Sequence, residues 1–309
     1  MKKGVKWVIV GVIGLGVLGT VFGAGKDKDE EKDNTKQIVT TTVNGTQPVT
    51  ESQATEAPKP TAVDVSITEQ VLLDKDGIKV TATGYSKDDI WGDGIDVLVE
   101  NNSDKTITVG LDAMIVNDYM VFDLFSCEVA AGKKANDTIN LFDTGLEAAG
   151  INMVGKVELY FHVYDGDWNK LFDSEYVEIK TSAYDSMDAG DFSGGAELYN
   201  EGGIRIVGQT VNEDSLFGKA IVLYIENNSG RNVSITADEL SINGFMITPY
   251  FSSTVYDGKK AIDDITLLSS ELEKNNITEI KDVELKFHLF DPDNYDGITE
   301  TETVKFQAK

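Results

Sequence analysis

Apolar and polar residues alternate along much of this sequence from Ile67 onward. The clearest example is Val157–Asp165, and Val283–Asp291 repeats its pattern. The strongly apolar residues are Val157, Leu159, Phe161 and Val163 in one stretch and Val283, Leu285, Phe287 and Leu289 in the other. A period of two is typical of a strand with one buried face. Further runs of strand type are Gly77–Tyr85, Ile95–Asn101, Thr106–Val109, Ala113–Val116, Tyr119–Phe122, Ala135–Phe142 and Lys170–Thr181.

The two alternating stretches belong to a tandem duplication with an offset of 283 − 157 = 126 residues. The same offset relates Glu100–Ser103 to Glu226–Ser229 and Gly132–Ala135 to Gly258–Ala261. About a third of the positions from Leu72 to Asp165 are identical between the copies, which indicates a repeated domain.

Turn and cap residues recur at equivalent positions in both copies. Asn117-Asp118 and Asn243-Gly244 lie where a tight hairpin turn needs positive φ angles. One short helix is predicted in each copy. The motifs Thr144-x-x-Glu147 and Ser270-x-x-Glu273 predict capping boxes, and Gly150 and Asn276 predict left-handed C-terminal caps.

About eight short strands and one helical turn in each copy predict an all-β fold of two tandem antiparallel β-sandwiches. We expect the first sandwich over residues 66–182 and the second over residues 197–309. Residues 183–196 are rich in Gly, Ser and Asp, so we expect a linker that lets the sandwiches move relative to each other.

The N-terminal 25 residues predict a membrane anchor. Trp7–Gly25 carries no charge and follows three lysines, and a helix of this length approaches the ~30 Å of a bilayer core. The preceding lysines place the N-terminus in the cytoplasm and the C-terminal part outside. A cleaved signal peptide, and hence a secreted protein, is the alternative. The glycines Gly19 and Gly23 fit a helix-contact motif for self-association, although glycine is also common in membrane spans.

Residues 26–65 are poor in large apolar side chains and rich in Thr, Asn, Gln, Glu and Pro. Such a segment buries too little apolar surface to offset its ordering entropy, so we expect a disordered stalk.

Charge and cysteine content narrow the classes of function. The formal net charge of −26 argues against nucleic-acid binding, which needs a basic surface. Cys127 is the only cysteine and aligns with Ser253, so the cores form without an intrachain disulfide. A buried, core-compatible residue is the simplest role for Cys127.

The repeated pattern DGIKVTATG…ENNSDKTITV…AAGKKANDTI…VELYFHVYD, together with the anchor and stalk, resembles a group of uncharacterised Gram-positive, Clostridia-type cell-surface proteins. These proteins have telokin-like, immunoglobulin-fold extracellular domains. The resemblance implies two immunoglobulin-like sandwiches, each with one short helix, displayed outside the cell. It brings no activity and no site residues.

The two histidines of the chain are candidate binding residues. Alternation places His162 and His288 on the strand face opposite the core. Their neighbours on that face are Tyr160 and Tyr164 in the first copy and Lys286 and Phe290 in the second. We interpret Tyr160, His162, Tyr164, His288 and Phe290 as a ligand platform or a pH-sensitive contact. The alternative is a histidine that pairs with Glu158 or Glu284 across the strand or packs against the linker.

Alternate carboxylates follow the same strand in both copies. Asp165 and Asp167 in the first copy and Asp291 and Asp293 in the second are candidate calcium ligands. The calcium-loop template then requires glycine and glutamate where this chain has Lys170 and Tyr176. Acidic turn residues explain the pattern equally well.

Two lysine pairs, Lys133-Lys134 and Lys259-Lys260, are the most compact basic points. We expect them to guard a strand edge or to contact an anionic wall polymer.

No catalytic motif accompanies the duplication, so we expect a non-catalytic protein rather than an enzyme, with no cofactor other than the calcium considered above. The leading hypothesis is a surface protein whose duplicated modules bind a protein or glycan ligand with avidity. The alternative is an envelope sensor or assembly partner that acts through its membrane helix.

Overall fold

The computed structural model describes residues 64–88 and 91–308, and these form an all-β structure. The predicted anchor at residues 1–25, including Gly19 and Gly23, and nearly all of the predicted stalk at residues 26–65 lie outside the described residues. Within the described part, no helix is long and apolar enough to cross a bilayer.

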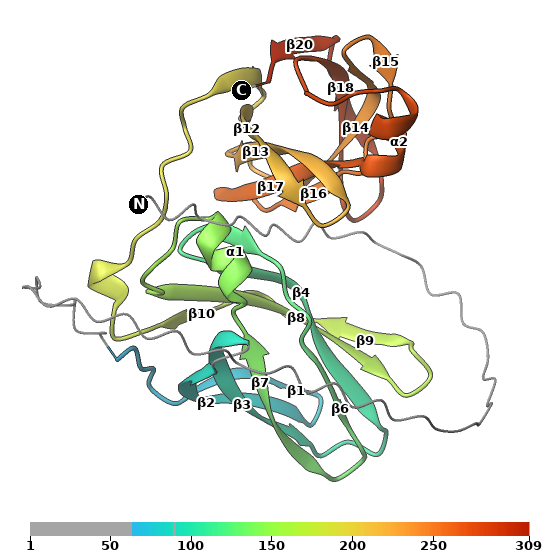
Figure 1. Cartoon of the computed structure of the whole chain (residues 1–309). Coiled ribbons are helices and arrows are strands. Elements are labelled where there is room, and N and C mark those ends of the chain that lie inside the picture. Colours follow the sequence, from blue (N-terminus) through green and yellow to red (C-terminus); the bar gives the residue numbers. More distant parts are fainter. Residues whose placement is uncertain (1–63, 89–90, 309) are drawn as a thin grey trace, which may run out of the picture. The chain divides into compact units, whose positions relative to one another are not determined.

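The first copy contains two sheets (Figure 1). One has the order β1-β2-β3-β7 and the other runs β10-β8-β4-β5, with β6 on β4 and β9 on β8. The strands are β1 (Gln70–Lys75), β2 (Ile78–Asp88), β3 (Gly92–Asn101), β4 (Ile107–Val116), β5 (Tyr119–Val121), β6 (Ser126–Val129), β7 (Lys134–Asn140), β8 (Lys156–Asp165), β9 (Lys170–Asp173) and β10 (Val177–Lys180), with α1 (Asp143–Ala148) between β7 and β8.

The second copy repeats this order. Strands β11-β12-β13-β17 form one sheet, and β14 and β18 pair in the other, with β15 and β16 on β14 and β19 and β20 on β18. The elements are β11 (Ala196–Glu201), β12 (Ile204–Ser215), β13 (Gly218–Asn227), β14 (Val233–Ile242), β15 (Phe245–Met246), β16 (Ser252–Val255), β17 (Lys259–Leu268), α2 (Ser269–Lys274), β18 (Asp282–Phe290), β19 (Gly297–Glu300) and β20 (Val304–Gln307). Each strand of the first copy therefore has a counterpart, at an offset of 126 or, after β18, 127 residues.

Each copy has its own hydrophobic core. The residues that alternation predicted to point inward are all buried, from Val157 to Val163 on β8 and from Val283 to Leu289 on β18. Cys127 is buried in the first core, and Ser253 is buried at the equivalent place. The alternating pattern and the role of Cys127 are confirmed.

Two predicted strands of the first copy are one strand. Apart from Thr106, the predicted strands Thr106–Val109 and Ala113–Val116 fall within β4, whose pairing with β8 shifts register between Leu111 and Ala113. The irregularity at Asp112 interrupts the apolar alternation, which is why the sequence suggested two short strands. The single run Lys170–Thr181 is divided into β9 and β10.

The capping-box prediction is wrong in both copies. The N-cap residues of α1 and α2 are Phe142 and Leu268, and neither has a side-chain cap. Thr144 and Ser270 therefore lie inside the first turn rather than before it.

The predicted C-terminal caps are confirmed. Gly150 and Asn276 have φ angles of 64° and 54°. The N–H groups of Gly150 and Ile151 donate to the carbonyls of Glu147 and Leu146, and the second copy repeats both bonds. This pair of bonds is the Schellman motif.

The predicted hairpin turns are also confirmed. Asn117 and Asp118 have φ angles of 47° and 69°, and Asn243 and Gly244 have φ angles of 51° and 85°. The side chain of each asparagine also accepts hydrogen bonds from the backbone at the start of β8 or β18. Asn117 Oδ1 accepts the N–H groups of Gly155 and Lys156, and Asn243 Oδ1 accepts those of Lys281 and Asp282.

The segment between the copies, predicted to be a flexible linker, is held by hydrogen bonds at both ends. Asp188 accepts the N–H groups of Asn152 and Met153, and the carbonyl of Gly190 accepts the Tyr119 hydroxyl at 2.9 Å. Toward the second copy, Gln209 donates to the carbonyls of Phe192 and Gly194. Composition did not indicate these partners, because they come from residues distant in the sequence.

Candidate functional site

An aromatic face covers the outer side of β8. Tyr160, His162 and Tyr164 alternate with the buried residues of this strand, as predicted. Tyr160 packs against Tyr176 with ring centroids 5.9 Å apart, and His162 packs edge-on against Tyr164 at 5.1 Å. These contacts place two pairs of rings along the outer side of β8, one of which includes Tyr176, just before β10.

The aromatic face extends to Trp168, which neither alternation nor motifs predicted as a site residue. Trp168 follows β8 with a φ angle of 62°, lies 6.3 Å from Tyr164 by ring centroids, and is 72% exposed. Tyr295 occupies the equivalent place after β18, also with a φ angle of 62°, 6.0 Å from Phe290 and 77% exposed. A left-handed backbone is costly for an aromatic residue, and exposing a large ring gains no burial energy. Both copies therefore keep a solvent-facing aromatic ring at the cost of local strain, which is common at functional sites.

His162 is fixed by two features of β4. Its Nδ1 lies 2.8 Å from Oδ1 of Asp112, so its partner is Asp112 and not the predicted Glu158. The ring lies over Gly110, where a Cβ atom would be only 2.4 Å from Nε2. The hydrogen bond with His162 outweighs burial and holds the pKa of Asp112 below its ordinary value. Nearby, burial raises the pKa of Asp123 to about 6.

The equivalent face of the second copy has aromatic residues but a different polar environment. His288 pairs across the sheet with Thr236 and Glu300, and its ring lies 5.9 Å from that of Phe290. Lys286 forms ion pairs with Glu239 and Glu300, where the first copy has Tyr160. The predicted pairing of His288 with Glu284 is not seen. The shared features of the two faces are therefore the histidine, the following aromatic residue and the exposed ring after the strand.

The candidate calcium residues stabilise the turn after β8. Asp165 Oδ1 accepts the N–H groups of Asp167 and Asn169, and its other oxygen pairs with Lys105 at 3.2 Å. These donors hold the pKa of Asp165 below its ordinary value. In the second copy, Asp291 accepts the N–H of Asp293. Across the described ranges, no three acidic, histidine or cysteine side chains form a group suited to a metal ion.

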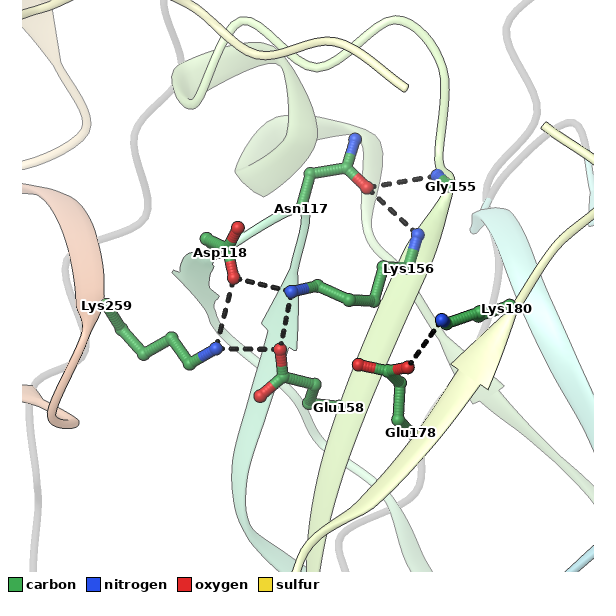
Figure 2. A network of polar contacts seen from close by, with 8 residues as sticks. All are labelled: Asn117, Asp118, Gly155, Lys156, Glu158, Glu178, Lys180 and Lys259. Carbon is green, nitrogen blue, oxygen red and sulfur yellow. Dashed lines mark hydrogen bonds and ion pairs between the residues drawn. The ribbon is translucent and has the colours of Figure 1, made fainter. Parts of the chain in front are cut away.

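A buried ion-pair network joins the two copies (Figure 2). Lys259 Nζ lies 2.7 Å from Oε1 of Glu158 and 3.0 Å from Oδ1 of Asp118. Lys156 contacts the same two acids at 2.9 and 2.6 Å. The side chains of Glu158 and Lys259 are only 5% and 14% exposed, whereas that of Asp118 is 39% exposed. Solvent therefore screens the pair of Lys259 with Glu158 more weakly than its pair with Asp118.

The charges of this network stabilise one another. Burial opposes ionisation of Asp118, but the hydrogen bonds from Lys156 and Lys259 outweigh it and hold its pKa below the ordinary value. Burial likewise disfavours charged Lys259, and its bonds to Glu158 and Asp118 still raise its pKa. Asp118 and Lys259 are therefore both charged at neutral pH.

Backbone and aromatic contacts extend the junction. The N–H of Lys260 donates to the carbonyl of Asp118, and this bridge joins the sheet of β8 and β4 to β17 in one ten-stranded sheet. Tyr256 packs edge-on against Tyr160 with centroids 4.7 Å apart. The lysine pair predicted to guard an edge or bind polymer is thus part of an internal junction in the second copy, whereas Lys134 in the first copy pairs with Glu100.

No protein-family model matches this chain. No curated protein sequence matches it either.

Proposed function

We propose that this protein is a membrane-anchored, non-catalytic surface protein that binds a ligand through two equivalent aromatic faces. The observation that carries the proposal is the recurrence of an exposed ring at a φ angle of 62° beside an aromatic strand residue, Trp168 by Tyr164 and Tyr295 by Phe290. Large amphipathic rings supply contact area at little entropic cost and often dominate binding interfaces.

Strand order supports two immunoglobulin-like modules at residues 66–182 and 197–309. In that fold strand B lies between A and E, and strand F lies between C and G. Here β3 lies between β2 and β7, and β8 lies between β4 and β10. The second copy has the same order, with a linker at residues 183–196.

The N-terminal sequence supports an anchor at residues 1–25 and a stalk at residues 26–65, so that both modules are displayed outside the cell. Duplicated sites on one chain raise avidity for a repetitive ligand. Such ligands are glycans or proteins rather than nucleic acids, given the net charge of −26.

A binding screen tests this function. The full chain in detergent is applied to immobilised wall polymers and host glycans, alongside W168A/Y295A and the control W91A, which removes an exposed ring at the β2–β3 connection. We expect a ligand that wild type and W91A retain and W168A/Y295A loses. The proposal would be contradicted if W168A/Y295A retained every ligand as well as wild type does. It would also be contradicted if wild type bound neither wall polymers nor host glycans.

A further inference from the structure

The second copy contains a groove at the open edge between its two sheets. Its volume is about 240 Å³, and it lies between β11, β12 and β20. Ile221 and Phe306 supply apolar surface, and Gly195, Ala196, Gly208 and Gln209 contribute to the rim. None of the lining residues carries a charge, and polar Gln209, Thr210 and Gln307 lie beside apolar Ile221, Phe306 and Ala308. The groove therefore suits an uncharged group with an aliphatic part and hydrogen-bonding atoms, such as a peptide.

Smaller residues open this groove relative to the first copy. Ala196 replaces Gln70, whose Nε2 donates to the carbonyl of Glu178 at 2.9 Å and spans the equivalent edge. Gly208 replaces Ala82, which is fully buried. Each change removes side-chain atoms that fill the same position in the first copy.

A third difference concerns the segment that closes the edge. In the first copy Ile67 packs against the core and bridges antiparallel to Thr181, while the N–H of Ser182 donates to the carbonyl of Ser66 at 2.8 Å. A short extended segment therefore seals the first sandwich with one aliphatic side chain.

Among the residues that the structure describes, the second copy has no such bridged segment. The equivalent of Ile67 is Ser193, whose hydroxyl bonds to Asp191 and whose carbonyl accepts Arg205. Between residues 64 and 308, leaving aside 89–90, no isolated bridge pairs Ser193 with Ala308, the equivalent of Thr181. Ala308, the equivalent of the bridge partner of Ile67, instead lines the groove.

We propose that this groove binds an extended peptide segment of a partner protein, with one aliphatic side chain in the cavity and its backbone alongside Ala308. This is recognition by strand addition, in which the backbone gives affinity and a pocket gives specificity. The site is separate from the aromatic faces and goes beyond the ligand binding proposed for them.

The segment that closes the first copy provides a peptide to test this proposal. A fluorescent peptide with the sequence of Asp64–Glu69, which includes Ile67, is titrated into the full chain and followed by polarisation. We expect saturable binding that is lost when the isoleucine of the peptide is replaced by aspartate. The variant A196Q/G208A restores the residues of the first copy and should weaken binding about tenfold or more, as expected for excluding one aliphatic side chain. A Cβ atom at Gly208 makes only ordinary contacts, at 3.4 Å or more, so this variant should fold.

The control variant L216A changes an exposed residue of the same copy and should bind as wild type. Equal binding of the peptide to A196Q/G208A, or a Kd weaker than about 1 mM for wild type, would overturn the proposal. A dimer that forms without peptide and is abolished by A196Q/G208A would assign the groove to a second copy of this chain and would also overturn it.

Discussion

Nζ of Lys259 lies 2.7 Å from Oε1 of Glu158, so a lysine of the second copy completes a charge cluster of the first. Lys133, the equivalent of Lys259 in the first copy, is exposed, and no ion pair of it is seen among the described residues. The same residue type thus has a junction role in one copy only, because only β17 meets the turn that carries Asp118.

Removing this lysine should destabilise the protein. We expect K259A to lower the free energy of unfolding by about 1–3 kcal/mol. In this variant Glu158 stays buried, and Lys156 is the one remaining cation of the network for both Glu158 and Asp118. Chemical denaturation of the full chain measures the change. The matched control K133A should change stability by less than about 0.5 kcal/mol; equal effects of the two variants would show that the junction contributes no stability.

The contact between His162 and Gly110 predicts a steric effect. G110A places a Cβ atom 2.4 Å from Nε2 of the imidazole, so the ring must leave Asp112 and stability should fall by about 1–3 kcal/mol. Nuclear magnetic resonance chemical shifts of the His162 ring follow the lost contact, and denaturation measures the stability. G166A is the control, because the nearest atom to its Cβ would be 3.6 Å away. Unchanged chemical shifts of the His162 ring in G110A would contradict the geometry.

The strained aromatic residues predict a separation of stability from binding. Asparagine tolerates a left-handed backbone better than tryptophan, so W168N should leave the free energy of unfolding unchanged or raise it by up to about 1 kcal/mol. The loss of the Tyr164 contact offsets part of the gain. A fall of more than about 2 kcal/mol would assign Trp168 a structural role instead.

A partly buried acid in β17, Asp263, predicts pH dependence. Burial raises the pKa of Asp263 to about 7, with a further increase from Asp264. The folded state therefore holds this proton more tightly than the unfolded state. The contribution of Asp263 to stability is therefore greatest below about pH 4, the ordinary range of the carboxyl, and is lost as the pH rises through about 7.

D263N should remove this pH dependence. It should be more stable than wild type by about 2–4 kcal/mol at pH 8 and nearly equal to it at pH 4. Denaturation at the two pH values measures the difference. D137N, at the equivalent and exposed position in the first copy, is the control and should show no such change. A constant difference between D263N and wild type across this range would refute the assignment.

The turn residues predict that calcium does not bind after β8. Asp165 already accepts two backbone N–H groups and an ion pair from Lys105. We expect no change in Tm between chelator and millimolar calcium for the full chain. A rise in Tm that D165N and D291N abolish would instead restore calcium as a ligand.

Much of the fold could be predicted because its signals depend on neighbours in the chain. Alternation located the buried faces of β8 and β18, and turn chemistry located the hairpins at Asn117 and Asn243. The helix caps were predicted correctly at Gly150, where a left-handed backbone restricts the residue type. The prediction of an N-terminal cap at Thr144 was wrong, since the residues of a capping motif also fit inside the first turn.

The site was predictable only in part. The outward position of His162 follows from alternation, but its partner Asp112 lies at an irregularity in β4 that no periodic pattern shows. Trp168 and Tyr295 align only after a one-residue insertion, and a comparison of aromatic residues after the Asp-x-Asp motifs with that insertion would have found them. The role of Lys259 depends on contact between distant segments, which the sequence does not encode locally.

The number of ligand sites per chain tests the central claim most directly. The ligand retained in the binding screen is titrated calorimetrically into the full chain, W168N and W168N/Y295N. We predict two equivalents per chain for wild type, one for W168N and none for W168N/Y295N. A single equivalent in wild type, or undiminished binding in W168N/Y295N, would contradict binding through two equivalent aromatic faces.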